Sequence, residues 1–167
     1  MSFSRLALIG TTVFALLASA GNVKAASGEA EAGATIIDSL SIVKSADLDI
    51  GSIVPSTSVG GVVRIAPEGN AECDAVLTCL TQTTAPARFA VQGNAGYVYA
   101  VTLPTVVVMS NGSKEMQVTA LTSSTRNGGL LDSDGLDELS VGGSVMIDAN
   151  QETGQYTGQF HVTVEYN

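Results

Sequence analysis

Short runs of alternating apolar and polar residues extend over most of the chain, and Gly, Asn, Asp, Ser or Pro residues separate them. An alternation with a period of two places successive side chains on opposite faces of a strand, whereas a helix repeats every three to four residues. Beyond residue 25 the apolar residues do not follow a helical period. Seven or more short strands predict an all-β domain, an antiparallel β-sandwich of the immunoglobulin-like or pilin-like kind.

Two hairpins are predicted from this alternation. In the first, Phe89 and Val91 precede turn residues 94–96, and the alternation then resumes. In the second, the Gly-Gly pair at 142–143 marks the turn between two apolar arms. The arms carry Tyr97, Tyr99, Val101 and Leu103 in the first hairpin and Leu139, Val141, Val145 and Ile147 in the second. Further strands are expected over residues 36–43, 61–66, 105–109 and 116–121, with a turn at 111–112.

The C-terminal residues carry the most regular alternation of the chain. The last twelve residues read YTGQFHVTVEYN, so apolar side chains share one face and polar side chains share the other. This pattern predicts a terminal strand with one face in the core. We call residues 154–166 the C-terminal segment. It begins at Gly154, fourteenth from the end, and its apolar positions are Tyr156, Phe160, Val162, Val164 and Tyr166.

The first 25 residues have the composition of a cleaved signal peptide. Arg5 supplies a positive charge, residues 6–20 are apolar and uncharged, and the VKA run at 23–25 places small residues before a cleavage point. We expect cleavage after Ala25 rather than after Ala20. About 15 apolar residues are fewer than the roughly 20 that span a bilayer as a helix, which argues against a retained anchor. We therefore expect an exported protein, in the periplasm, at the cell surface or in an extracellular fibre.

Signal removal, with the loss of Arg5 and Lys24, leaves a strongly acidic chain. Sixteen Asp and Glu residues then stand against five Lys and Arg residues, a net charge of −11. This charge favours solubility and repels phosphate backbones, so we expect no nucleic-acid partner. The remaining length fits one domain. We expect a flexible segment over residues 26–35 and a β-sandwich domain over residues 36–167.

Cys73 and Cys79 are the only cysteines. An even number of cysteines in an exported chain favours a disulfide. The five residues between them argue against a CxxC redox pair, and a single histidine is too few to complete a zinc site. We predict a bond that pins a short excursion of the chain and contributes about 2 kcal/mol.

No residue pattern predicts a catalytic site or a cofactor. His161, the only histidine, falls on the polar face of the C-terminal segment, and the chain has no nucleophile-elbow motif. Asp132, Asp134 and Asp137 could offer oxygen ligands to Ca²⁺, but their spacing is not that of an EF-hand loop, and we prefer a solvated turn. Residues 111–113 match a glycosylation sequon, whose Asn-Gly pair is more simply a turn.

The end of the chain resembles the C-terminal signature of chaperone–usher pilins, which has an alternating apolar strand, a penultimate Tyr and a Gly fourteen residues from the end. Tyr166 and Gly154 stand at these positions. In those pilins a periplasmic chaperone caps the sheet edge that an incomplete sandwich exposes. The resemblance implies a chaperone, an usher and neighbouring subunits as partners.

A longer resemblance covers almost the whole mature chain. Four runs of its sequence are similar to the bacterial envelope family known as domain of unknown function 4402. Ile50-Gly51 stands where that family more often has an aromatic-Gly pair. Membership implies an exported β-sandwich and names no catalytic residue. The runs are ADLDIGSI (46–53), GGVVRIAP (60–67), ARFAVQGNAGYVYAVTLP (87–104) and LSVGGSVMIDANQETGQYTGQFHVTVEYN (139–167).

We therefore expect a non-enzymatic structural protein, a fimbrial, pilin-like or surface-fibre subunit with a role in cell adhesion that assembles by β-strand exchange. The alternative is a self-complete, monomeric envelope module that binds a ligand through its loops. Strand exchange needs a donor segment, and two candidates stay open. One is the small-residue alternation of residues 26–34, and the other is the bulkier set of Ile36, Leu40 and Ile42, which also fits the first strand of the domain.

Overall fold

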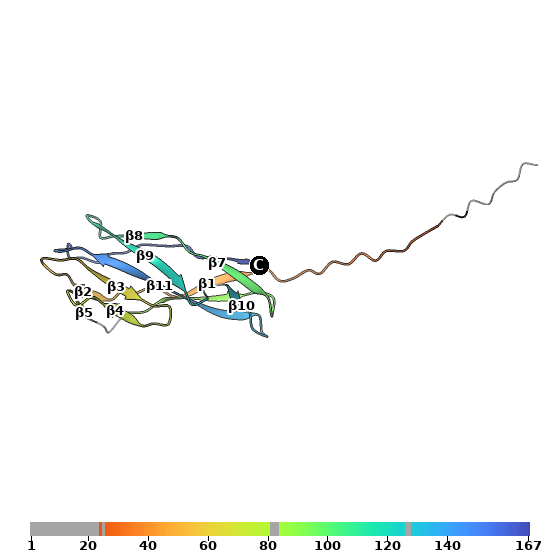
Figure 1. Ribbon diagram of the computed structural model, residues 1–167, viewed down its shortest axis with the longest axis horizontal. Coiled ribbons are helices and arrows are strands. Elements are labelled where there is room, and N and C mark those ends of the chain that lie inside the picture. Colours follow the sequence, from red (N-terminus) through yellow and green to blue (C-terminus); the bar gives the residue numbers. More distant parts are fainter. Residues whose placement is uncertain (1–23, 25, 81–83, 126–127) are drawn as a thin grey trace, which may run out of the picture. The chain divides into compact units, whose positions relative to one another are not determined.

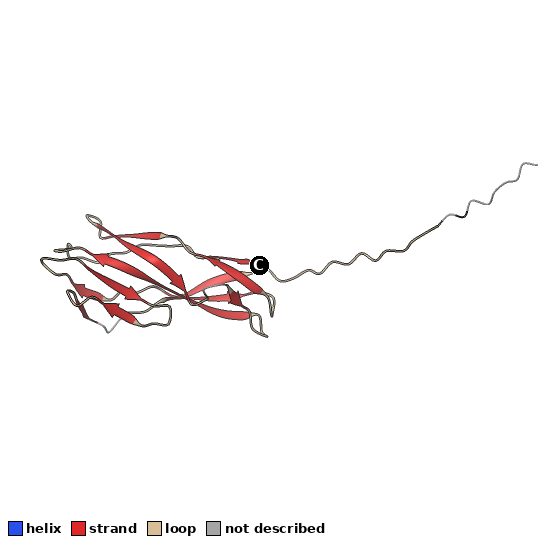
Figure 2. Ribbon diagram, viewed as in Figure 1, coloured by secondary structure: helices blue, strands red, loops and turns tan. Residues whose placement is uncertain are grey.

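The computed structural model describes residue 24 and residues 26–80, 84–125 and 128–167, and all of its regular structure is β (Figures 1 and 2). Apart from Lys24, the expected signal peptide lies outside these residues. Residues 26–35 belong to no strand and are exposed, and Ile36–Asn167 form one compact unit. None of the described residues belongs to a helix that is long and apolar enough to cross a membrane.

Twelve strands are found in the described residues. They are β1 Ser41–Ala46, β2 Ser52–Val54, β3 Gly61–Ile65, β4 Ala71–Cys73, β5 Thr78–Leu80, β6 Ala87–Gln92, β7 Val98–Thr102, β8 Val106–Ser110, β9 Glu115–Ser123, β10 Gly129–Leu130, β11 Leu136–Ile147 and β12 Thr163–Tyr166.

These strands form three antiparallel sheets. The largest has seven strands, with β11 at its centre. Strands β6 and β3 pair with successive parts of one edge of β11, and β1 and β4 pair with β6 and β3 in turn. Strand β9 pairs with the opposite edge of β11, and β8 pairs with β9. Strands β10-β7-β12 form a second sheet, and β2 pairs with β5 in a third. The predicted all-β sandwich is confirmed.

Strand β11 runs through both halves of the hydrophobic core. Its residues Leu139 and Val141 belong to one buried group of side chains, whereas Val145 and Ile147 belong to another. Full burial of an aliphatic or aromatic side chain contributes roughly 1.5–3 kcal/mol. We call the groups the Tyr99 cluster (Ala87, Val91, Tyr99, Leu131, Leu139 and Val141) and the Val118 cluster (Val63, Ile65, Leu77, Val107, Val118, Val145 and Ile147).

Gly142 and Gly143 lie inside β11, so the hairpin predicted around them was wrong. A tight hairpin turn needs positive φ angles, which neither glycine has. Glycine is needed for space instead. A Cβ atom on Gly142 would lie 2.1 Å from the carbonyl oxygen of Ile65, and one on Gly143 would lie 2.8 Å from Cγ1 of Val118. The bare backbone thus leaves room for the carbonyl of Ile65 on β3 and for the Val118 side chain of β9.

The predicted hairpin around residues 94–96 was also wrong, although both strands form. Strand β6 pairs with β1 and β11, whereas β7 pairs with β10 and β12 in the second sheet. The Tyr97 N–H donates to the Asn94 carbonyl at 3.3 Å, and the chain crosses between sheets there. Val91 on β6 and Tyr99 on β7 pack in the same cluster. The alternating residues therefore belong to two strands that contact each other through core side chains and not through backbone hydrogen bonds.

Three of the four other strand predictions hold in position. Strands β3, β8 and β9 overlap the expected ranges, and residues 111–112 turn the chain between β8 and β9. In that turn, Oδ1 of Asn111 accepts hydrogen bonds from the N–H groups of Ser113 and Lys114. The first strand was placed too early. It begins at Ser41, and Ile36 is 96 % exposed.

Tyr99 connects the large sheet to the second sheet. Its side chain is fully buried on β7, and its hydroxyl donates a hydrogen bond of 2.9 Å to Oδ2 of Asp137 on β11. A Cβ atom on Gly129 would lie 2.1 Å from the ring, so the neighbouring strand needs glycine there. Burial raises the pKa of Tyr99 well above its ordinary value of 10.0, and the hydrogen bond and negative charge of Asp137 act in the same direction.

Replacing Gly142 with alanine is expected to lower the free energy of unfolding by about 2 kcal/mol, because the methyl group overlaps the backbone of Ile65. Chemical denaturation measures this loss. Gly33→Ala is the control, since a Cβ atom there meets nothing within 4 Å. Equal stabilities of the two variants would contradict the close packing of β3 against β11.

The free energy of unfolding is expected to fall as the pH rises above about 10. Tyr99 then ionises in the unfolded chain but keeps its proton in the folded protein, so alkali favours unfolding. The contribution of this one group approaches about 1.4 kcal/mol per pH unit. Denaturation between about pH 9 and pH 11 should show a shallower decline for Tyr99→Phe than for the parent. Identical slopes would contradict the assignment.

Candidate assembly surface

The C-terminal segment has the alternation of burial that its sequence predicts. Five of its side chains are half-buried, whereas His161, Thr163 and Glu165 are exposed. The half-buried ones are Tyr156, Phe160, Val162, Val164 and Tyr166. Phe160 packs against both core clusters, and its ring meets that of Phe89 edge-on at 6.4 Å between centroids. The apolar face therefore covers the junction of the two halves of the core.

Only parts of the segment are hydrogen-bonded to neighbouring strands. Strand β12 pairs with β7, with Tyr166 opposite Tyr99. Upstream, Thr157 and Ser110 exchange two backbone hydrogen bonds of 2.9 and 3.0 Å. A Cβ atom on Gly158 would lie 2.4 Å from the carbonyl oxygen of Val108, so this approach to β8 needs glycine. The segment thus passes from the edge of β8 to the edge of β7.

Contacts within the subunit also fix the start of the segment. Gly154 has a φ of 153° and lies beside Asn111, where a Cβ atom would come 3.1 Å from Nδ2. The Tyr156 hydroxyl donates to the carbonyl of Glu152 at 2.9 Å and accepts a hydrogen bond of 2.8 Å from Nε2 of Gln151. These bonds hold residues 151–156 in place beside the β8–β9 turn.

The penultimate tyrosine makes contacts inside its own subunit. The Tyr166 hydroxyl accepts a hydrogen bond of 2.7 Å from the N–H of Asn94 and donates one of 3.0 Å to the carbonyl of Asp38. Its ring meets that of Tyr97 edge-on at 5.7 Å between centroids. Tyr166 therefore fastens the C-terminus to the residues that precede β1.

Residues 40–53 and the C-terminal segment flank one side of the sandwich and run in opposite directions. Asp38 lies beside Tyr166 at one end, and residues 48–55 lie across a cleft from residues 151–156 at the other. In the described residues, β1 pairs only with β6, and β12 pairs only with β7. We call these two flanking segments together the seam. Their half-buried apolar side chains are Leu40, Ile42, Leu48, Ile50, Ile53, Tyr156, Phe160, Val162 and Val164.

A cleft of about 580 Å³ opens at one end of the seam, a size within the range of ligand-binding sites. Its apolar floor is formed by Ile53, Met109, Met116 and Ile147, which also belong to or pack against the Val118 cluster. Its rim is polar and carries two carboxylates. The residues that line it are all described, and Lys, Arg and His are absent from them. The polar rim residues with long or charged side chains are Asp49, Gln151, Glu152 and Gln155.

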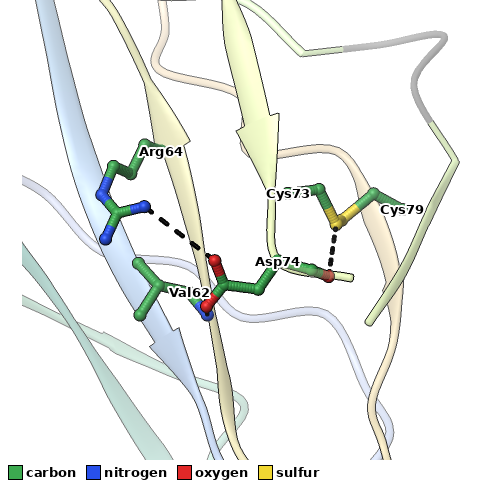
Figure 3. A network of polar contacts seen from close by, with 5 residues as sticks. All are labelled: Val62, Arg64, Cys73, Asp74 and Cys79. Atoms are coloured by element: carbon green, nitrogen blue, oxygen red, sulfur yellow. Dashed lines mark hydrogen bonds and ion pairs between the residues drawn. A yellow bond between two sulfur atoms is a disulfide. The ribbon is translucent and has the colours of Figure 1, made fainter. Parts of the chain in front are cut away.

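Cys73 and Cys79 form the predicted disulfide (Figure 3). It joins β4, at the edge of the large sheet, to β5 of the two-stranded sheet. Beside it, Oδ2 of Asp74 accepts a hydrogen bond of 2.8 Å from the N–H of Val62, and Oδ1 lies 4.0 Å from the Arg64 guanidinium. The bond therefore does more than pin a local excursion, because it ties two sheets together.

Of the three weak calcium candidates, Asp132 and Asp134 lie in the exposed turn before β11, and Asp137 lies in β11 itself. Oδ1 of Asp132 accepts hydrogen bonds of 2.9 Å from the N–H groups of Asp134 and Leu136. Asp137 is engaged by Tyr99. Over the described parts of the chain, no group of three or more His, Cys, Asp or Glu residues is arranged to hold a metal ion. The structure does not bring the three aspartates together as a site.

Two features of this surface were missed from the sequence: the cleft and the internal contacts of Tyr166. Both join segments that lie far apart in the chain, with 128 positions between Tyr166 and Asp38. The alternating pattern marks Phe160 and Tyr166 as inward-facing residues, but it carries no information on which distant segment each one meets.

A family model described as Domain of unknown function (DUF4402) matches residues 40–166. The matched range extends from just before β1 to the end of β12, so it includes both flanks of the seam. It confirms the longer of the two resemblances found in the sequence. No curated protein and no solved structure matches the chain.

Phe160→Ala is expected to lower the free energy of unfolding by about 2 kcal/mol or more, because a half-buried ring that touches both clusters is lost. His161→Ala, the adjacent change on the exposed face, should stay within about 0.5 kcal/mol of the parent. Chemical denaturation compares them. A larger loss for the histidine variant would show that the two faces of the segment are exchanged.

Proposed function

The chain belongs to this family of unknown function, and we propose that it is an exported, non-enzymatic structural subunit that assembles by β-strand exchange. The observation that carries the proposal is the seam. Strands β1 and β12 do not pair with each other, and the two flanks carry half-buried apolar side chains, most of which pack against the core clusters. Unpaired backbone groups and partly exposed apolar side chains favour the addition of a strand.

A strand that enters the seam gains two kinds of contact. Its backbone pairs with the outer edge of β1 or of β12, and its alternate side chains cover the apolar residues on both flanks. The main-chain bonds supply affinity, and the side chains determine which segment fits. A neighbouring subunit or a periplasmic chaperone can supply such a strand, and an usher would then export the growing fimbrium. Adhesion at the cell surface is consistent with this assembly.

Three sequence features support the exported location in this proposal. They are the N-terminal pattern of a signal peptide, the paired cysteines and the acidic composition. A disulfide forms and persists in oxidising compartments outside the cytoplasm. A high net charge keeps subunits soluble before they assemble.

The Tyr166 contacts favour the alternative, a self-complete binding module. The hydroxyl bonds to Asn94 and Asp38 close one end of the seam within a single chain. A module of this kind would remain monomeric and would use its loops or its cleft for ligand recognition. The two functions therefore differ in whether the remainder of the seam accepts a strand.

Light scattering after size-exclusion chromatography tests the proposal on purified residues 26–167. Association that increases with protein concentration, or a folded monomer that an added strand stabilises, supports the proposal. A peptide of residues 26–45 should raise the denaturation midpoint, whereas the same peptide with Ser at Ile36, Leu40 and Ile42 should not. A cooperatively folded monomer at every concentration that ignores both peptides would overturn strand exchange in favour of the binding module.

A further inference from the structure

The cleft combines an apolar floor with a negatively charged rim. Asp49 and Glu152 are both exposed and stand on opposite flanks of the seam. Hydrogen bonds hold each carboxylate: Oδ1 of Asp49 accepts one of 2.8 Å from the N–H of Gly51, and Oε1 of Glu152 accepts one of 2.5 Å from the hydroxyl of Ser113. Because no cationic side chain lines the cleft, the charge of the rim is not neutralised within it.

Backbone groups beside the cleft are available to an extended chain. Strand β2 pairs with β5 along one edge only. On the opposite flank, the N–H groups of residues 152–156 donate to no protein acceptor in the described part of the chain. An extended segment can therefore combine main-chain hydrogen bonds with burial of apolar side chains on the floor.

We propose that this cleft accepts an extended apolar segment from a different protein, and that a Lys or Arg side chain of that segment meets the acidic rim. This inference rests on the proposed function, since it names the partner of the same seam. A second copy is disfavoured by charge. Between residues 26 and 43 the chain carries Glu29, Glu31 and Asp38 and has no Lys or Arg. Like charges that meet across an interface suppress the wrong partner.

Nuclear magnetic resonance titration of the mature protein tests the inference with three capped peptides. Two have alternating Val and Ser residues and differ only in a central Lys or Glu, and the third is residues 26–43. We expect the Lys peptide to shift the amide signals of residues 50–54 and 151–156. We also expect it to bind about tenfold more tightly than the Glu peptide at low salt, with a smaller difference at high salt.

Charge-neutral variants distinguish the effect of the two rim carboxylates from the effect of the overall negative charge of the protein. Asp49→Asn with Glu152→Gln should abolish the preference for Lys, while both side chains keep their oxygen acceptors. Glu68→Gln, an exposed acidic residue outside the cleft lining, should leave the preference unchanged.

Three outcomes overturn the inference: equal binding of the Lys and Glu peptides, shifts that map outside the cleft, or tighter binding of residues 26–43 than of the Lys peptide. The last outcome would leave strand exchange intact and identify a second copy as the partner. If no peptide binds and the protein is monomeric at every concentration, the proposed function fails as well.

Discussion

The close approach of β3 and β9 to the bare backbone of β11 is the contact on which the architecture depends. Gly142 leaves room for the carbonyl of Ile65 on β3, and Gly143 leaves room for the Val118 side chain on β9. The large sheet continues through the middle of the domain at this point. One twelve-residue strand then supplies core residues to both clusters. Everything that packs on this sheet, including the C-terminal segment, is positioned relative to that strand.

The two halves of the core are covered in different ways. The Tyr99 cluster lies beneath three hydrogen-bonded strands, and the Tyr99–Asp137 bond crosses between the sheets. The Val118 cluster is covered in part by β2 and β5, which have three residues each. A two-stranded sheet is at best marginally stable alone. The disulfide and the buried side chain of Leu77 hold this cover, and the cleft opens beside it.

The sequence allowed prediction of side-chain faces but not of strand partners. The alternation correctly located β3, β6 to β9 and the exposed face of the C-terminal segment, because local periodicity determines which side chains turn inward. It gave two wrong hairpins. Residues 94–96 connect strands in different sheets, and the glycines at 142–143 serve close packing in extended backbone rather than a turn. Pairing is a long-range property, and the same spacing of apolar residues fits both arrangements.

For the assembly surface, the same limit applies. The disulfide followed from composition alone, whereas the cleft depends on the meeting of residues 48–55 with residues 151–156. The penultimate tyrosine was expected to serve a partner, yet within one subunit its hydroxyl already has a donor and an acceptor. Its position in the sequence indicated importance but not which chain it would contact.

The contact between Tyr166 and Asp38 also constrains when folding can finish. It joins positions 128 residues apart, and Tyr166 belongs to β12, the last strand in the described part of the chain. A chain delivered from its N-terminus must therefore hold the residues before β1 without this bond until β12 has been made. Closure of long-range contacts is a slow step of folding for β proteins. Tyr166 can thus fasten the beginning of the domain only after the other eleven described strands have been made.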